Sequence, residues 1–395
     1  MTRKQYKVAV FVETSRGYGR ELCEGIADFA QANGHWTFQG GGDSWEKGLL
    51  NLSVKPDGVI ARIPNAKLAR ALTKLQVPVV DLYGWRRYPS ISSVDADHAA
   101  IGRMAAAWFM DRRFKNFAFC GYTGAPFSDA RGAAFNAAVK TAGYACSVYK
   151  EVAFSTDFLG SMILQAERYD DPPDRDRLAA WLTSLKRPTA VFCCHDIRAY
   201  QVAAVCKELE LSVPHEVAVM GVDNDRILCA FSDPMLTSID PDAQRIGWTG
   251  AEQLFELMSR GGKGGRHVLV SPKQMFERAS TETDPVEPPC LAKALHFIRR
   301  QIPSGVNAGE VIRYMGLSHT QADRIFANAL GKTIHEEITR LRMREACRLL
   351  EETTLSVTLI SQKTGFTSPQ YFCRYFQHHV KMSPVDYRTT CSHPV

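Results

Sequence analysis

The sequence has no Cys-x-x-Cys pair and no long apolar run. These absences argue against a disulfide-stabilised protein and against a membrane-spanning protein. Its 11 cysteines are odd in number, and Cys193-Cys194 lie in an apolar segment, where we expect them in a core. This usage suits a reducing compartment rather than a disulfide framework. No segment approaches the roughly 20 apolar residues that a membrane helix needs. The run KVAVFV before Glu13 predicts a strand rather than a signal peptide, so we expect a cytoplasmic protein without a membrane partner.

Motifs for catalysis and for metal binding are missing as well. GGKGG at 261–265 has no Ser or Thr after its lysine and no strand before it, so it is not a phosphate-binding loop. His378-His379 and His335-Glu336-Glu337 lack partners at the spacing of a metal site. No nucleophile elbow or other catalytic set stands out, so we expect no enzyme, no catalytic residue, no metal and no cofactor.

The positive charge of the chain lies mainly in its last third. The 395 residues carry a net charge of +6, and their length allows two or three domains. From Val286 onward 14 Lys and Arg oppose 9 Asp and Glu, a balance of +5, whereas the first 285 residues carry 34 against 33. Such an excess is expected where a domain meets phosphates, although a solvated basic surface is the plainer explanation.

The segment 356–388 predicts a helix-turn-helix unit. Val357 and Ile360 lie on one face of a short helix, and Gly365-Phe366 makes the turn. The second helix begins at Ser368-Pro369, because Ser is a good N-cap and Pro at the first helical position loses no hydrogen bond. Its buried stripe is predicted to contain Phe372, Phe376 and Val380. Its outward face carries Gln370, Arg374 and Gln377, which suit base edges or phosphate.

A similar unit precedes it, and the turn glycines Gly316 and Gly365 are 49 residues apart. The lead helix of this first unit is predicted over Ala308–Met315, and Ser318 is the N-cap of the next helix. The buried face of that next helix is predicted to contain Ala322, Ile325, Phe326 and Ala329. Its outward face contains His319, Thr320, Asp323 and Arg324. For each of these outward residues three alternatives stay open: contact with a base, contact with a phosphate, or exposure to solvent alone.

One long amphipathic helix, predicted from Ile334 to about Glu352, joins the two units. At about 1.5 Å per residue it spans nearly 30 Å. Successive major-groove faces on one side of a duplex are about 34 Å apart. A rigid helix of that length can therefore present both recognition helices to one face of DNA.

Residues 1 to about 283 alternate short β-branched runs with amphipathic helical segments. The predicted strands are Lys7–Val12, Gly58–Ile63, Val77–Leu82, Phe117–Cys120, Ser147–Val152, Ala190–Cys194 and Val217–Gly221. The predicted helices are Leu22–Ala32, Ala66–Leu75, Ala99–Met110, Arg131–Ala142, Asp174–Leu185 and Ala199–Leu209. This alternation predicts βαβ units and parallel sheets. One sheet could hold seven strands, but the length favours two lobes with a cleft between them.

Polar residues follow the predicted strands, at the positions where open parallel sheets bind ligands. These positions include Glu13 to Tyr18, Arg62, Gly121 to Arg131, His195-Asp196 with Arg198, and Asp223 to Asp225. Carboxylates, an amide, arginines and aromatic rings suit the hydroxyls and C–H faces of a sugar. A phosphorylated ligand would favour more basic residues and a glycine-rich cradle, which we do not find.

Each of these strand-end residues also has a plainer explanation. Asp196 and Asp223 could cap the helices that follow them, Arg131 could form a surface salt bridge, and Tyr18 could pack over a hinge. The agreement of several strand ends favours a ligand site more than any one residue does.

A domain boundary is predicted at 281–289, TETDPVEPP, because its three prolines fix an extended backbone. We therefore predict a ligand-binding domain over 1–283, a linker over 284–290 and an all-α DNA-binding domain over 291–395. The last domain is expected to open with a helix over Leu291–Ile302.

The C-terminal motifs resemble those of AraC/XylS-type transcription regulators. The match to their second helix-turn-helix consists of Gly365-Phe366, Tyr371-Phe372, Phe376, Ser383-Pro384 and Tyr387-Arg388. The resemblance implies that Thr320, Asp323 and Arg324 of the first recognition helix face bases, with His319 outward beside them, and that Gln370 and Arg374 do so in the second. Asp323 could accept from cytosine. Lys381 stands where that family usually has Gly, so the turn there is expected to be strained or differently shaped.

The segment before the linker resembles the type I periplasmic-binding-protein-like sensor domain of LacI-type regulators. The resemblance rests on DGVIARI, VPVVDL, FAFCG, AVFCCHDIRA, VPHEVAVMGVDND and SIDPDAQRIG. It implies that Arg131, Asp196 and Asp223 contact the ligand, and that Tyr18, Phe127 and Asn224 line its site. His195 departs from the Asn or Thr that this fold more often has, which leaves the sugar preference open.

The two resemblances together imply a regulator of the xylose-operon type. We expect a bacterial, nucleoid-associated homodimer that binds double-stranded promoter DNA and a sugar such as D-xylose, contacts RNA polymerase, and activates genes of sugar transport and catabolism. A regulator of the same architecture that responds to another monosaccharide or a small polyol is the first alternative. A transport-type solute-binding protein, or an enzyme built on a sugar-binding fold, would instead require export or substrate turnover.

Overall fold

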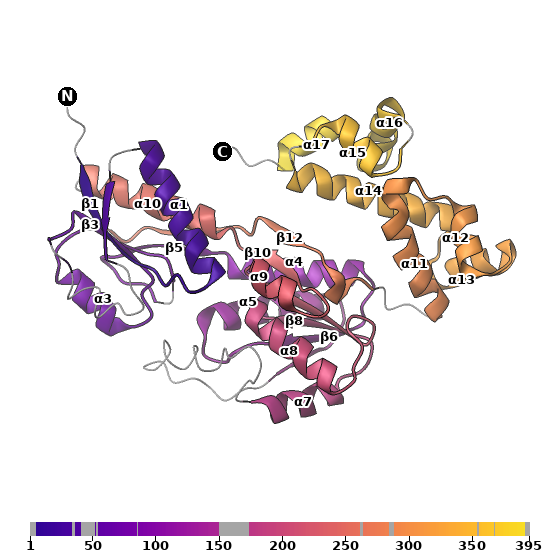
Figure 1. The fold of residues 1–395 in the computed structure, drawn as a ribbon, viewed down its shortest axis with the longest axis horizontal. Helices are drawn as coiled ribbons and strands as arrows, with labels where there is room; N and C mark the ends of the chain where they lie inside the picture. Colours follow the sequence, from indigo (N-terminus) through magenta and orange to yellow (C-terminus); the bar gives the residue numbers. More distant parts are fainter. Residues whose placement is uncertain are drawn as a thin grey trace. The chain divides into compact units, whose positions relative to one another are not determined.

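The computed structural model describes residues 5–33, 36–40, 52, 54–84, 86–149, 174–260, 264–283, 288–353, 355–366 and 368–391. The chain divides into two compact units, Met1–Glu282 and Thr283–Val395 (Figure 1). Three predicted features lie partly outside the described residues: the end of the strand at 150–152, the start of GGKGG at 261–263, and the linker at 284–287.

The first unit contains two six-stranded sheets, so the prediction of two lobes is confirmed. The first sheet has the order β11-β5-β4-β3-β1-β2, and each of its strand pairs is parallel. Its strands are β1 (Tyr6–Phe11), β2 (Trp36–Gln39), β3 (Gly58–Ala61), β4 (Val79–Asp81), β5 (Ser92–Ala96) and β11 (His267–Val270). The run Gly58–Ala61 is buried throughout, as expected for a parallel strand covered by helices on both faces.

The second sheet has the order β12-β10-β9-β8-β6-β7, and only β12 runs antiparallel to its neighbour. Its strands are β6 (Asn116–Cys120), β7 (Cys146–Val148), β8 (Thr189–Cys193), β9 (Val217–Val222), β10 (Thr237–Asp240) and β12 (Gln274–Phe276). The chain crosses between the sheets after β5, after β10 and again after β11, so three connections join the two lobes.

The helices of the first unit cover these sheets. They are α1 (Gly17–Asn33), α3 (Ala66–Thr73), α4 (His98–Asp111), α5 (Pro126–Thr141), α7 (Arg175–Ser184), α8 (Asp196–Glu208), α9 (Arg226–Phe231) and α10 (Ala243–Arg260). Helix α1 packs on α10, and α4 packs on α5. The backbones of α1 and α10 meet at Gly25, where a Cβ atom would collide with the carbonyl oxygen of Gln244.

The predicted helix boundaries in this unit differ from the structure at several starts. Helix α5 begins at Pro126, five residues before the predicted start at Arg131, because Pro occupies its first turn. Helix α8 begins at Asp196 rather than Ala199. As a result, Phe127 and Asp196 lie on helices rather than in loops. Helices α9 and α10 were not predicted.

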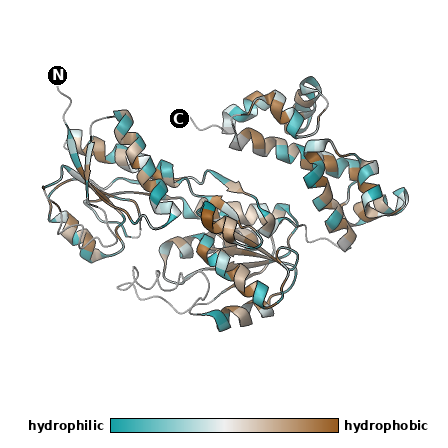
Figure 2. Ribbon diagram, in the orientation of Figure 1, coloured by the Kyte–Doolittle hydropathy of each residue, from teal (hydrophilic) through white to brown (hydrophobic). Residues whose placement is uncertain are grey.

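The second unit is helical: α11 (Pro289–Gln301), α12 (Ala308–Met315), α13 (His319–Leu330), α14 (Ile334–Glu352), α15 (Val357–Lys363), α16 (Pro369–Val380) and α17 (Pro384–Cys391). Helix α14 contributes to two separate cores. Ile334, Ile338 and Leu341 pack with α11 to α13, whereas Met343, Ala346 and Leu350 pack with Phe372 and Phe376 of α16. Figure 2 shows helices of this unit with hydrophobic and hydrophilic sides, as this arrangement requires.

Side-chain caps fix where the recognition helices begin. Ser318 and Gln321 form a capping box at the start of α13, and Ser368 accepts from the amide of Tyr371 at the start of α16. The prediction that Ala329 is buried is wrong, because Leu330 occupies the buried position at the end of α13 and Ala329 is exposed. Within the described ranges, none of the helices combines the length and apolar character needed to cross a bilayer.

Candidate ligand and DNA-binding sites

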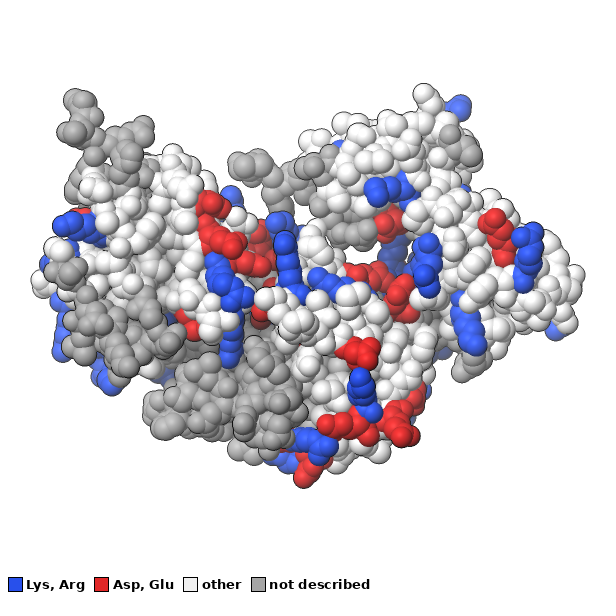
Figure 3. Space-filling view, in the orientation of Figure 1, with Lys and Arg blue, Asp and Glu red and all other residues white. Residues whose placement is uncertain are grey.

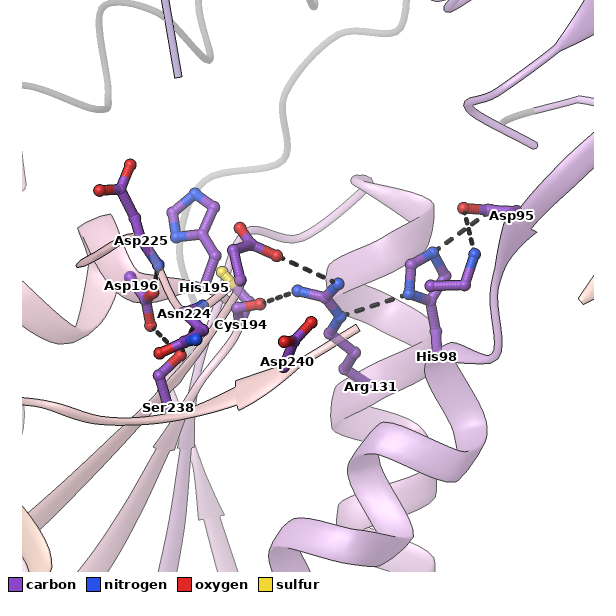
Figure 4. A network of polar contacts seen from close by, with 12 residues as sticks. Asp95, His98, Arg131, Cys194, His195, Asp196, Asn224, Asp225, Ser238 and Asp240 are labelled. Carbon is purple, nitrogen blue, oxygen red and sulfur yellow. Dashed lines mark hydrogen bonds and ion pairs between the residues drawn. The ribbon is translucent and has the colours of Figure 1, made fainter. Parts of the chain in front are cut away.

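Arg131 lies at the centre of a polar network at the strand ends (Figure 4). Its side chain is 3% exposed, so the alternative of a surface salt bridge is wrong. The Nε atom donates to Nδ1 of His98 over 3.3 Å, and one terminal nitrogen donates to the carbonyl oxygen of Cys194. The other terminal nitrogen lies 3.7 Å from a carboxylate oxygen of Asp223. The guanidinium is thus oriented by groups from the starts of α4 and α8 and from the end of β9.

Asp196 orients the loop that follows β9. One carboxylate oxygen accepts from Ser238 Oγ at 2.6 Å, and the other accepts from the amide of Asp225 at 2.8 Å. Asp196 is not the N-cap of α8, because His195 takes that place and accepts from the amide of Arg198. Burial, followed by the charge of Asp223, raises the pKa of the Asp196 carboxyl to about 7.

The loop after β9 has an uncommon backbone conformation. Asp223 and Asn224 have φ angles of 105° and 49°, a region that non-glycine residues adopt mainly under functional or structural constraint. The amide of Asn224 donates to Ser238 Oγ, and its side-chain oxygen accepts from Arg278 at 2.6 Å. Asp223 is not a helix cap, because Asp225 caps α9. The Asp223 side chain is 23% exposed and pairs with Arg131.

Aromatic rings border the same network. The rings of Phe127 and His195 stack with centroids 5.9 Å apart. The rings of Tyr122 and His195 meet edge-on, with centroids 5.4 Å apart. The guanidinium of Arg131 lies 5.4 Å from the centroid of the Phe127 ring. Phe127 is therefore placed beside Arg131, as predicted ligand-lining residues should be.

The first lobe contributes Arg62 and Tyr18, which the strand-end positions included, and Asp81 and Tyr83, which were not predicted as ligand contacts. The guanidinium of Arg62 lies 5.2 Å from the ring centroid of Tyr18 and 4.6 Å from that of Tyr83. Asp81 is 1% exposed, and one of its oxygens accepts from the amides of Ile63 and Tyr83. Its other oxygen is buried and has no hydrogen-bond partner among the described residues, and the same is true of Nε of Arg62.

Burial dominates the protonation behaviour of this half of the network. It raises the pKa of the Asp81 carboxyl to about 7, against the opposing effect of the amides of Ile63 and Tyr83. Burial, followed by the charge of Asp95, also raises the pKa of the Tyr18 hydroxyl. Both groups are thus held in environments that disfavour their charged forms.

The strand-end rule could have found Asp81. The predicted strand ran through Leu82, which placed Asp81 inside it, whereas β4 ends at Asp81. Asp95 and His98 were missed for a similar reason, because β5, which contains Asp95 and ends before His98, was not predicted.

A pocket of about 270 Å³ adjoins this network. Its lining comes from the first sheet and the segments that follow its strands, from the start of α4 and from α5. It comprises Tyr83, Gly84, Asp95, Ala96, Asp97, His98, Ala99, Pro126, Phe127, Ala130 and Leu269. The volume lies slightly below the roughly 300–1,000 Å³ typical of drug-sized ligands, which fits a smaller molecule. Within the part of the chain that the structure describes, no group of three His, Cys, Asp or Glu side chains is arranged to hold a metal ion.

In the helical unit, the predicted DNA-contacting residues lie on the outward faces of α13 and α16. His319, Thr320, Arg324, Gln370 and Arg374 are exposed, and Asp323 is partly buried. Nδ1 of His319 lies 2.8 Å from a carboxylate oxygen of Asp323, so the one acidic residue in this group has a partner on its own helix. Tyr371, next to Gln370, is 48% exposed. On the face in view in Figure 3, Lys and Arg lie among Asp and Glu on both units.

Comparison with known proteins finds a family match within each unit. Residues 106–281 match the periplasmic binding protein-like domain family, and residues 311–390 match a helix-turn-helix domain family. The chain therefore resembles transcription regulators in which a periplasmic-binding-protein-like domain precedes an AraC-type helix-turn-helix domain.

Relatives with this domain order extend along the whole chain. The xylose operon regulatory protein of Escherichia coli K12 is 27% identical over 98% of both chains, and that of Haemophilus influenzae is 26% identical over 99% of this chain and 100% of its own. The solved structure of a xylose-binding transcription activator is 27% identical, covers 100% of both chains and has a TM-score of 0.63. The predicted resemblance to the xylose operon regulators is therefore confirmed.

A further solved structure shows the fold of the first unit alone. A LacI family transcriptional regulator from Enterococcus faecium with bound ribose covers 70% of this chain, with 18% identity and a TM-score of 0.55.

Proposed function

We propose that this chain is a homodimeric transcription activator whose binding to promoter DNA responds to D-xylose or a closely related pentose. The observation that carries the proposal is the polar network at the strand ends of both sheets, in a chain that also has two helix-turn-helix units. The full-length similarity to proteins named for xylose supports the choice of sugar.

The sugar is held by groups from both lobes. The unpaired carboxylate oxygen of Asp81 accepts a hydroxyl hydrogen, and Nε of Arg62 donates to a hydroxyl oxygen. From the second lobe, Arg131 and Asp223 form hydrogen bonds to neighbouring hydroxyls, because a guanidinium and a carboxylate each engage two groups in one plane. The rings of Tyr18, Tyr83 and Phe127 pack against the C–H faces.

Binding groups on both lobes provide a physical basis for the switch. A sugar that bridges Asp81 of the first sheet and Arg131 of the second binds the closed arrangement of the lobes more tightly than the open one. That difference in affinity shifts the population toward the closed form. A shift from one dominant form to the other requires about 5.5 kcal/mol of differential binding. Closure then changes how the two DNA-binding units of a dimer engage their half-sites.

The DNA-binding units use α13 and α16 as recognition helices. Gln370 and Arg374 contact base edges in one major-groove segment, and Thr320, Asp323 and Arg324 do so in the other. The activator works in the bacterial cytoplasm at the nucleoid, contacts RNA polymerase, and catalyses no reaction.

Calorimetry against D-xylose, D-ribose, L-arabinose and D-glucose tests the sugar, and footprinting with and without each sugar tests the switch. Tight D-xylose binding with a sugar-dependent footprint is expected. Binding of another monosaccharide alone would select the alternative regulator, and consumption of the sugar would select an enzyme. An unchanged footprint and promoter activity with every sugar would refute the switch.

Arg131→Ala separates recognition from folding in these assays. It is expected to abolish sugar binding while leaving sugar-independent DNA binding intact. Arg266→Ala is a matched control, because Arg266 is exposed and lies 3.8 Å from Glu256, away from the network.

A further inference from the structure

We propose that His98 is a positioning residue for sugar recognition, which holds Arg131 in place for the ligand only as the neutral tautomer with hydrogen on Nε2. The inference rests on the proposed function, because it explains how that site orients its arginine. The observation behind it is a line of contacts from Asp95 through His98 to Arg131 (Figure 4), which continues from Arg131 to Asp223.

The tautomer follows from the chemistry of the guanidinium. Nε of Arg131 always carries a hydrogen and never accepts one, so Nδ1 of His98, at 3.3 Å, must be the acceptor. In a neutral imidazole the other nitrogen then carries the hydrogen. That nitrogen, Nε2, lies 3.3 Å from a carboxylate oxygen of Asp95 and donates to it. Each ring nitrogen of His98 therefore has one role, fixed by its neighbour.

Asp95 is itself held firmly in place. Gly84, which has φ of 58°, lies against it so closely that a Cβ atom there would collide with the carboxylate. The other Asp95 oxygen accepts from the amide of Ala96 at 2.8 Å. Because Asp95 is on β5 of the first sheet and Arg131 is on α5 beside the second, His98 ties the orientation of the arginine to the opposite lobe.

The charged and titratable groups around His98 come from several elements. Asp95 faces it from β5, and Arg131 faces it from α5 with Asp223 behind the guanidinium. Asp97 lies at the start of α4, where its side chain accepts from the amide of Ala100. Tyr83 lines the same pocket as His98. His195 is separated from His98 by the ring of Phe127, whose centroid is 6.4 Å from that of His98.

Protonation of His98 breaks this line at one point. A hydrogen on Nδ1 removes the acceptor for Nε of Arg131 and places two cations against each other. Arg131 then keeps its contacts with Cys194 and Asp223 but loses the one that ties it to the first lobe. Sugar affinity is therefore expected to be lower with His98 in its protonated form than in its neutral form.

Two substitutions separate positioning from mere packing. In His98→Asn the amide oxygen lies close to the place of Nδ1, so it still accepts from Arg131 but does not titrate. In His98→Leu the bulk is kept and the acceptor is lost. His267→Leu is the matched control, because Nδ1 of His267 is bonded to Ser93 Oγ at 2.8 Å on the neighbouring strand, outside the pocket.

The affinity of the full chain for D-xylose is measured by calorimetry between pH 5 and pH 8, with urea unfolding as a check on folding. We expect His98→Leu to weaken binding about tenfold at pH 8, as for a lost charge-assisted hydrogen bond. His98→Asn should stay within about threefold of the wild type, a difference of less than one such bond, and lose most of the pH dependence. His267→Leu should resemble the wild type in both respects.

Equal losses in His98→Asn and His98→Leu, or no loss in His98→Leu, would overturn the inference. The tautomer is tested without any sugar by ¹⁵N–¹H spectra of histidine-labelled protein, in which His98→Leu identifies the signal. Hydrogen on Nε2 is expected, and hydrogen on Nδ1 would overturn the inference. If the wild type binds no pentose but shows the Nε2 tautomer, the proposed sugar has failed while the arrangement of His98 stands.

Discussion

Lys381 and Gly331 occupy the same place at the ends of the two recognition helices, with φ angles of 66° and 65°. The amide of Lys381 donates to the carbonyl of Gln377, as the amide of Gly331 does to Ala327. The turn after α16 therefore keeps the shape that glycine favours, although the residue is lysine. The expectation of a strained turn is confirmed, and that of a different shape is wrong.

Lys381→Gly is expected to stabilise the helical unit by about 0.5–1 kcal/mol. Relief of the left-handed conformation gains roughly 1–2 kcal/mol, and the greater freedom of glycine in the unfolded chain offsets part of it. Unfolding in urea, followed by circular dichroism, measures the change. All six tryptophans lie before residue 283, so their fluorescence reports the first unit and should not change. Gly331→Lys should have the opposite effect, and stabilisation by that change would contradict the explanation.

Asp196 is expected to matter for stability more than its place among the predicted ligand contacts suggests. Asp196→Ala leaves the Ser238 hydroxyl and the Asp225 amide without their acceptor in a buried setting, so a loss of about 2–4 kcal/mol is expected. Ser238→Ala removes the hydrogen bond to Asp196 and the acceptor of the Asn224 amide, and should cost about 1–3 kcal/mol. Urea unfolding followed by tryptophan fluorescence measures both. A stability of Asp196→Ala close to that of the wild type would show that the loop is held by other contacts.

The fold was largely predictable because its signals are local. The glycine turns, the N-caps and the apolar spacing fixed α12 and α14 to their observed bounds. The site was less predictable, because its geometry depends on which strand ends meet. Arg131 and Asp223 were found because they follow predicted strands, whereas His98 follows a short strand, Ser92–Ala96, whose polar residues gave no clear strand pattern.

The roles of the predicted site residues could not be derived from sequence position. Asp196 is hydrogen-bonded to Ser238, 42 residues away, and Asn224 to Arg278, 54 residues away. These partners occupy polar atoms that we had expected to bind the ligand. Conversely, one oxygen of Asp81 has no hydrogen-bond partner among the described residues. Long-range partners of this kind decide which polar groups remain available.

The buried carboxyl of Asp81 makes a specific prediction about pH. Its pKa is raised from an ordinary value of 3.8 to about 7, so between these values the folded state binds more protons than the unfolded state. The contribution of Asp81 to stability therefore falls as the pH rises from about 4 to about 7, and is constant above that. Asp81→Asn removes this effect, so its stability relative to the wild type should increase over that range. Asp176→Asn, at a 99% exposed side chain, is the control. A difference that is independent of pH would show that Asp81 is ionised throughout.

The second recognition helix allows DNA contact and folding to be separated. Arg374 and Gln370 are exposed on α16, whereas Phe376 of the same helix is fully buried. Arg374→Ala is expected to weaken promoter binding by about 1–3 kcal/mol and to relax the preference at one base pair, with no change in unfolding. If Arg374 contacts a phosphate instead, binding should weaken equally for all sequences, and the dependence of affinity on salt should become shallower.

Phe376→Ala should cost about 3–5 kcal/mol of stability and abolish binding through loss of the fold. Binding assays at several salt concentrations, paired with urea unfolding, distinguish the three outcomes. Unchanged binding by Arg374→Ala and by Gln370→Ala would mean that α16 does not lie in the groove.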